Sequence, residues 1–204
     1  MSVTLIANPK GGCGKSTLAT NLAAWHAWQG DEVALADLDR QQSSRRWLEH
    51  RSLNFPAIER WDIDPDDPRE THCAKAVIDS PAGLHGKRLD AAIKLADRVL
   101  VPVQPSSFDM WASEAFFARL SEEKAVRKGR LPVAVVGMRV NARTVAAREL
   151  ARFLERFDLP VLTCLRETQL YVQTLPRGLG IFDLPAPKIE RDLAEWQPIF
   201  TWLK

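Results

Sequence analysis

The segment Lys10-Gly11-Gly12-Cys13-Gly14-Lys15-Ser16-Thr17 decides the fold of this 204-residue chain. It follows an apolar run at residues 3–7 and opens a stretch, residues 15–29, that is predicted to be helical. A strand, a glycine-rich loop, a lysine and a hydroxyl residue at a helix start together form a phosphate-binding P-loop. Glycines let several backbone N–H groups converge on one anion, and the helix adds the positive end of its dipole.

The loop predicts a role for each of its polar residues. Lys15 is expected to reach the β- and γ-phosphates of a nucleotide, and the Ser16 hydroxyl is expected to ligate Mg²⁺. A second lysine, Lys10, stands at the head of the loop, where the ordinary pattern G-x-x-x-x-G-K-[ST] has glycine. The residues expected to bind the nucleotide are Lys10, Gly11, Gly12, Cys13, Gly14, Lys15, Ser16 and Thr17.

Apolar runs and helical stretches alternate from end to end. Strands are predicted at residues 3–7, 32–37, 55–61, 75–79, 98–103, 132–140 and 160–165. Helices are predicted at residues 15–29, 41–50, 89–96, 106–124, 145–157, 168–175 and 187–203, and the acidic, proline-broken residues 62–68 are predicted to form a loop. This order indicates an α/β fold, a mainly parallel twisted sheet with helices on both faces, built as one domain over residues 1–204.

The composition narrows the class of protein. Hydrophobic residues make up 46% and charged residues 26% of the chain, as in soluble globular proteins. No apolar run approaches the roughly 20 residues that span a bilayer, and the N-terminus lacks a secretory pattern, so a cytoplasmic location is expected. Cys13, Cys73 and Cys164 have no metal-ligand spacing, so structural roles are expected. The net charge of +2 neither requires nor excludes nucleic acid.

Three aspartates follow predicted strands. Asp37 and Asp39 are two residues apart, so their carboxylates point to the same side of an extended chain. Near a triphosphate, such groups hold hydrated Mg²⁺ and orient the attacking water. Asp79 ends the apolar strand 75–79, the position of a Walker B aspartate that binds Mg²⁺ through water. The structural alternative for each is a turn or helix cap.

These segments resemble the ParA/MinD family of P-loop ATPases. Residues 10–16 resemble its deviant Walker A loop, K-G-G-x-G-K-[ST], residues 37–41 resemble its D-x-D-P-Q segment, and residues 79–81 resemble D-x-P. Arg40 departs from the pattern because it stands in place of the proline. Residues 8–12, 104–109 and 169–172 are most similar to the small ParF-like branch of ParA partition proteins.

The resemblance implies a slow, Mg²⁺-dependent ATPase that cycles between ATP and ADP. By resemblance, Lys10 crosses the interface of an ATP-bound homodimer, Asp39 is the hydrolytic aspartate, Asp37 lies in the outer shell of the metal, and Arg139 contacts adenine. The family also implies a ParB-like or other adaptor that stimulates hydrolysis, non-specific DNA, no membrane, and a nucleoid-associated role in positioning plasmids, chromosomes or protein assemblies.

Two basic clusters are candidates for DNA contact. Arg148, Arg152 and Arg156 are four residues apart, which places them on one face of the predicted helix, and Arg143 precedes them. The second cluster contains Lys124, Arg127, Lys128 and Arg130. The alternative is a solvated helix face whose arginines are offset by Glu149 and Glu155.

Two other functions use related P-loops. One is a metabolic ligase that acts on a small carboxylic acid, which needs a substrate pocket. The other is a MinD-like switch at a membrane surface, which needs a basic amphipathic tail. Residues 189–196 are acidic, and Pro198 is expected to interrupt the last helix.

Overall fold

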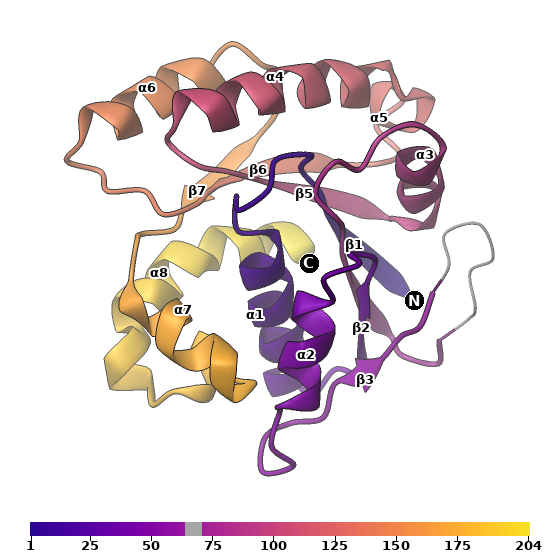
Figure 1. Cartoon of the computed structure of the whole chain (residues 1–204), viewed down its shortest axis with the longest axis vertical. Helices are drawn as coiled ribbons and strands as arrows, with labels where there is room; N and C mark the ends of the chain where they lie inside the picture. The colour runs from indigo at the N-terminus through magenta and orange to yellow at the C-terminus, as the bar shows by residue number, and fades with distance from the viewer. Residues whose placement is uncertain (64–70) are drawn as a thin grey trace.

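A parallel sheet forms the centre of the protein. The computed structural model describes residues 1–63 and 71–204. Within them, seven strands pair in the order β3-β2-β4-β1-β5-β6-β7, and every neighbouring pair is parallel (Figure 1). The strands are β1 (Ser2–Ile6), β2 (Val33–Asp37), β3 (Glu59–Arg60), β4 (Lys75–Asp79), β5 (Arg98–Val103), β6 (Val133–Gly137) and β7 (Val161–Cys164).

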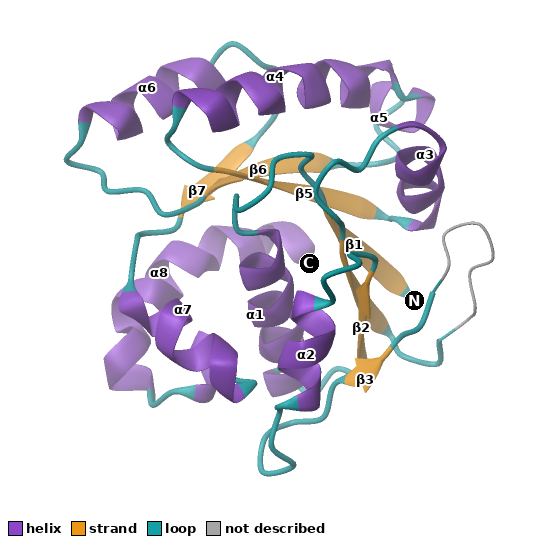
Figure 2. Cartoon of the chain, viewed as in Figure 1, coloured by secondary structure: helices purple, strands orange, loops and turns teal. Residues whose placement is uncertain are grey.

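Helices cover both faces of the sheet (Figure 2). One face carries α3 (Gly86–Leu95), α4 (Ser107–Glu122), α5 (Lys124–Arg127) and α6 (Val145–Leu154). The other carries α1 (Lys15–Trp28), α2 (Ser43–Glu49), α7 (Gln169–Thr174) and α8 (Ala186–Leu203), with the 3₁₀ turns η1 (Leu175–Arg177) and η2 (Ile181–Asp183). The predicted fold class is confirmed. Among the described residues, no helix has both the length and the apolar character that crossing a bilayer requires.

The two helical layers exist because the central strands are apolar on both sides. In β1, Leu5 belongs to the core under α3–α6, whereas Ile6 belongs to the core under α1 and α8. Leu100 and Val101 divide in the same way on β5. Successive strand residues point to opposite faces, so an uninterrupted apolar run requires a layer of helices on each.

Three predicted boundaries and the interruption expected at Pro198 are wrong. The strand expected at residues 55–61 is reduced to β3, since Phe55 and Pro56 contact Arg51 instead of the sheet. The helix expected at residues 106–124 breaks at Glu123, where an extended residue separates α4 from α5 and lets residues 125 and 126 pack on the core.

The third boundary is the end of α6, and the interruption concerns α8, whose bounds agree with the predicted residues 187–203. Helix α6 ends at Leu154, so Arg156 lies beyond it. Pro198 lies inside α8 without ending it, because Trp196, Ile199 and Phe200 are buried around it and offset the lost backbone hydrogen bond. The predicted loop at residues 62–68 falls mostly on residues 64–70, outside the described part of the chain.

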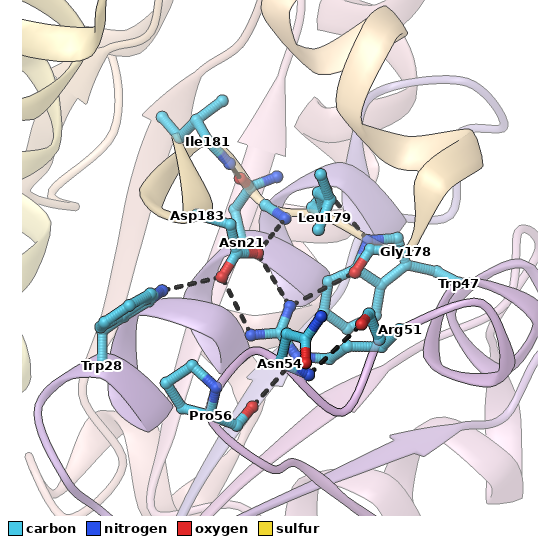
Figure 3. Close-up of polar contacts among 12 residues, drawn as sticks. Asn21, Trp28, Trp47, Arg51, Asn54, Pro56, Gly178, Leu179, Ile181 and Asp183 are labelled. Carbon is cyan, nitrogen blue, oxygen red and sulfur yellow. Dashed lines mark hydrogen bonds and ion pairs between the residues drawn. The ribbon is translucent and has the colours of Figure 1, made fainter. Parts of the chain in front are cut away.

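A buried ion pair joins the segment after α2 to the C-terminal part of the chain (Figure 3). Arg51 donates to both carboxylate oxygens of Asp183, at 2.8 and 3.0 Å, and stacks over the rings of Trp47 and Phe55. The side chains of Arg51 and Asp183 are 4% and 0% exposed, so neither charge is solvated. Asp183 also accepts hydrogen bonds from Trp28 Nε1 and from the backbone of residue 180. Removing either side chain would therefore leave the other as a buried charge without its partner.

Arg51→Met is expected to lower the free energy of unfolding by about 3–5 kcal/mol, because it leaves Asp183 as a buried, unpaired charge. Methionine keeps an apolar stem against Trp47 and Phe55, so the loss reports the charge and not the packing. Arg45→Ala is the control, since its pair with Glu49 is solvent-exposed and is worth about 0.5 kcal/mol or less. Urea unfolding measures both, and equal midpoints for the two variants would contradict the expectation.

Candidate nucleotide-binding site

Two glycines of the P-loop have conformations that other residues resist. Gly12 has φ of 78° and Gly14 has φ of 99°, both in the left-handed region. A Cβ atom on Gly14 would also lie 2.8 Å from Met138 Cε. Glycine at position 14 therefore lets the loop turn, and it leaves room for the Met138 side chain that follows β6.

The Lys15 side chain folds back over the loop. Its ammonium group donates to the Lys10 carbonyl at 2.8 Å and lies 3.8 Å from Cys13 Sγ. The Cys13 thiol also donates to the Lys10 carbonyl, at 3.2 Å. Burial raises the pKa of this thiol, although the charge of Lys15 lowers it in part. Cys13 thus supports the loop as a neutral thiol, consistent with the expected structural role.

Asn8 anchors the start of the loop and was missed as a site residue. Its side chain is fully buried and donates to the Pro102 carbonyl at 2.8 Å and to Ser113 Oγ at 2.9 Å. Its oxygen accepts from the Lys10 backbone at 2.9 Å. A polar residue directly after an apolar strand is the signal that could have identified it, because a buried amide needs several partners.

The carboxyl ends of three more strands surround the loop. The Gly83 N–H after β4 donates to the Pro9 carbonyl at 2.8 Å, and Gln104 after β5 donates to the Gly12 carbonyl at 2.7 Å. Met138 after β6 contacts Gly14, as described above. Strand order reverses around β1, so the loop lies at the topological switch point, where ligands bind open parallel sheets.

Asp37 and Asp39 shape the segment that leads into α2. Asp37 accepts from the backbone N–H groups of Asp39 at 2.9 Å, Ser44 at 2.8 Å and Arg45 at 3.1 Å. Asp39 accepts from the Gln41 backbone at 2.9 Å, and both aspartates are half-buried. In this structure the two aspartates therefore act as turn and helix-cap residues, which was the structural alternative. The expected roles of Asp37 toward the metal and of Asp39 toward water stay predictions.

Asp79 is the most unusual group of the site. It is fully buried, one oxygen accepts from Ser44 Oγ at 2.5 Å, and no described residue hydrogen-bonds to the other, Oδ1. Burial raises the pKa of Asp79 to about 7, an effect that the hydroxyls of Ser44 and Ser16 reduce. A buried carboxylate oxygen without a donor is costly, which indicates a missing ligand.

The residues present fit a nucleotide with Mg²⁺. Gly12 and Gly14 shape a cradle of backbone N–H groups at the start of α1, and Lys15 supplies a cation there. The oxygens of Ser16, Asp37 and Asp79 form the hard donor set that Mg²⁺ prefers. Within residues 1–63 and 71–204, no three histidine, cysteine, aspartate or glutamate side chains gather as a metal site, either here or elsewhere. The three cysteines are free.

Lys10 and Arg139 are the other two residues predicted to contact the nucleotide through their side chains. Among the described residues, none hydrogen-bonds or ion-pairs with the Lys10 ammonium group, which leaves it available. Arg139 follows Met138 directly, is exposed, and has φ of 53°. Its expected contact with adenine stays a prediction.

The predicted arginine stripe is not continuous. Arg143, Arg148 and Arg152 are exposed, whereas Arg156 pairs with Glu114 at 2.7 Å and stacks on Phe153 and Phe157. Arg156 therefore lies beyond α6, but its side chain is 59% exposed and its partner Glu114 is exposed too, so its expected contact with DNA stays a prediction.

Residues 4–180 match the model of the CobQ/CobB/MinD/ParA nucleotide binding domain. The chain belongs to this family. A maintenance of carboxysome distribution protein A from Halothiobacillus neapolitanus is 29% identical over 189 residues, which cover 89% of this chain and 87% of that protein. Protein ParA of Rhizobium radiobacter is 28% identical over 142 residues, which cover 67% of this chain and 64% of that protein. The family resemblance of the sequence is confirmed.

Solved structures show the same fold. Apo McdA of Cyanothece superposes with a TM-score of 0.73 at 18% identity, covering 97% of this chain and 98% of that one. MinD cell division protein of Aquifex aeolicus superposes with a TM-score of 0.69 at 19% identity, covering 92% and 93%. At these identities, the likeness supports the fold and not a shared cargo.

Asp79→Asn is expected to stabilise the nucleotide-free protein above pH 7 by roughly 2–4 kcal/mol. The folded-state pKa of about 7 exceeds the ordinary 3.8, so the folded protein keeps a proton that the unfolded chain releases. The free energy of unfolding of the wild type therefore falls between about pH 4 and pH 7, and the gain from the substitution shrinks toward zero at pH 4.

Urea unfolding in EDTA across this pH range measures the difference. Asp158→Asn, a change at an exposed aspartate, serves as the control and is expected to follow the wild type. A constant offset between Asp79→Asn and the wild type at every pH would refute the raised pKa.

Proposed function

We propose that this chain is an ATP-dependent, dimerising switch ATPase that positions cargo, acting as a single domain over residues 1–204. The observation that carries the proposal is the P-loop in which Lys15 occupies the loop while the Lys10 ammonium group has no described partner. A lysine at the head of the loop is not needed to hold the loop together, so it is available to a ligand or a second subunit.

In the proposed cycle, the P-loop binds the phosphates. Lys15 exchanges the Lys10 carbonyl for the β- and γ-phosphates, and the N–H groups of residues 11–17 surround them. Ser16, Asp37 and Asp79 hold Mg²⁺, which neutralises charge on the phosphates when it is bound. Arg139 contacts the adenine ring of the nucleotide. Phosphoryl transfer requires mainly positioning and charge stabilisation, so few groups suffice.

Dimerisation and hydrolysis use Lys10 and Asp39. Lys10 reaches the nucleotide of the partner subunit, so two subunits close only around ATP. Asp39 orients the attacking water, and opening follows the loss of the γ-phosphate. Hydrolysis to ADP and phosphate is slow until a ParB-like or other adaptor protein stimulates it.

The cargo is a plasmid, a chromosome or a protein assembly. A relative named for carboxysome distribution and another named ParA support this range. We propose that the ATP-bound dimer binds non-specific DNA through Arg143, Arg148 and Arg152, which places it at the nucleoid in the cytoplasm.

Mass in solution tests the switch. The Asp39→Ala protein, in which hydrolysis is expected to be slowed at least tenfold, should be a dimer with ATP and a monomer with ADP. Adding Lys10→Ala should remove the dimer, because the contact across the interface is lost. Light scattering coupled to size exclusion measures each state, and Lys188→Ala, an exposed lysine on α8, is the control.

A mass that depends on neither nucleotide nor Lys10 would refute the switch. ATP turnover that rises only with a small carboxylic acid would then favour the metabolic ligase. ATP-dependent flotation with liposomes would favour a membrane-surface switch.

Replacing Arg148 and Arg152 with glutamate should abolish ATP-dependent retention on DNA. Each lost phosphate contact lowers the slope of log affinity against log salt by about 0.9, so two contacts in each subunit predict a fall of about 3.6 for a dimer that binds through both subunits. Lys188→Glu with Lys204→Glu makes an equal charge change at the two ends of α8, across the sheet, and is the matched control. Unchanged retention at low and moderate salt would exclude this helix face.

A further inference from the structure

The hydroxyl of Ser44 contacts a buried carboxylate, that of Asp79, one of whose oxygens has no hydrogen-bond partner in the described part of the chain. Ser44 Oγ donates to Asp79 Oδ2 at 2.5 Å, and both side chains are fully buried. Asp79 Oδ1 has no hydrogen-bond partner among the described residues. The two oxygens of one carboxylate are therefore distinct: one is held from α2, and the other remains for a ligand.

Ser44 is itself held in place by the neighbouring strand. Asp37 and Asp79 lie opposite each other in the register of β2 and β4. Asp37 accepts from the backbone N–H groups of Ser44 and Arg45, which fixes the first turn of α2 against the end of β2. Two adjacent strand ends thus hold Ser44, one through its backbone and one through its hydroxyl.

A serine at the start of a helix ordinarily serves as a cap, but Ser44 does not. A capping hydroxyl accepts from a backbone N–H group of the first turn. The Ser44 hydroxyl instead donates away from its helix to a strand, and Asp37 supplies the acceptor for the first N–H groups of α2. Capping therefore does not account for the Ser44 hydroxyl.

We propose that Ser44 is a positioning residue for magnesium binding, which sets the orientation of the Asp79 carboxylate from helix α2. By engaging Oδ2, its hydroxyl keeps Oδ1 free to accept from the water shell of Mg²⁺. Outer partners of this kind orient metal-binding carboxylates and contribute to affinity. The inference rests on the proposed nucleotide function and deepens it by linking α2 to the metal side of the site.

The test compares Ser44→Ala with Ser43→Ala. Ser43 is the adjacent residue of α2, is exposed, and makes no side-chain hydrogen bond to another described residue. Binding of the non-hydrolysable analogue AMP-PNP is measured by calorimetry over a series of MgCl₂ concentrations and in EDTA. Urea unfolding verifies that each variant is folded, and Ser44→Cys offers a similar shape with a weaker donor.

Ser44→Ala should require about tenfold more Mg²⁺ for half-maximal AMP-PNP binding, the low end of the loss for an outer partner of a metal ligand. The affinity of Ser44→Ala for AMP-PNP in EDTA should equal that of the wild type. A general disturbance of the site would lower this affinity as well. Ser44→Cys should be intermediate, and Ser43→Ala should match the wild type.

Two results overturn the inference, and they differ in what else they affect. Magnesium-dependent binding that is the same in the wild type and in Ser44→Ala overturns the role of Ser44 and leaves the proposed function intact. A wild type whose AMP-PNP binding does not depend on Mg²⁺ overturns the proposed function and this inference together.

Discussion

The buried side chain of Asn8 is the interaction on which the site depends. It links the end of β1 to β5 through the Pro102 carbonyl and to α4 through Ser113, while its oxygen holds the Lys10 N–H. All three partners are needed because a buried amide without them would be strongly unfavourable. The phosphate loop therefore starts from a fixed point, and the left-handed glycines that follow can direct their N–H groups inward.

Helix α2 is fixed at both ends. At its start, Asp37 and Asp79 hold Ser44 at the ends of β2 and β4. Near its end, Trp47 Nε1 donates to the Leu179 carbonyl at 3.1 Å, and Arg51 beyond it forms the buried pair with Asp183. One short helix thus joins the ends of β2 and β4 to the C-terminal segment (Figure 1).

Strong local patterns led to correct predictions, and weak ones did not. The apolar runs of β1, β4 and β5, the glycine loop and the helix that follows it are predicted from residue type alone. The break at Glu123 and the continuation of α8 through Pro198 depend on packing against residues distant in sequence. Arg156 matched the helical spacing, but Glu114 on another helix engages it.

The sequence by itself determined the parallel sheet between two helical layers and the place of the phosphate loop, because these depend on periodic apolar residues and on glycines with special backbone angles. Only the tertiary structure decided which polar groups meet. Asn8, Ser44 and Gln104 carry no local signal of their distant partners, since the hydrogen bonds to Pro102, Asp79 and Gly12 join residues 35 or more positions apart. A buried hydroxyl or amide acquires its role from the strand or loop that folding brings beside it.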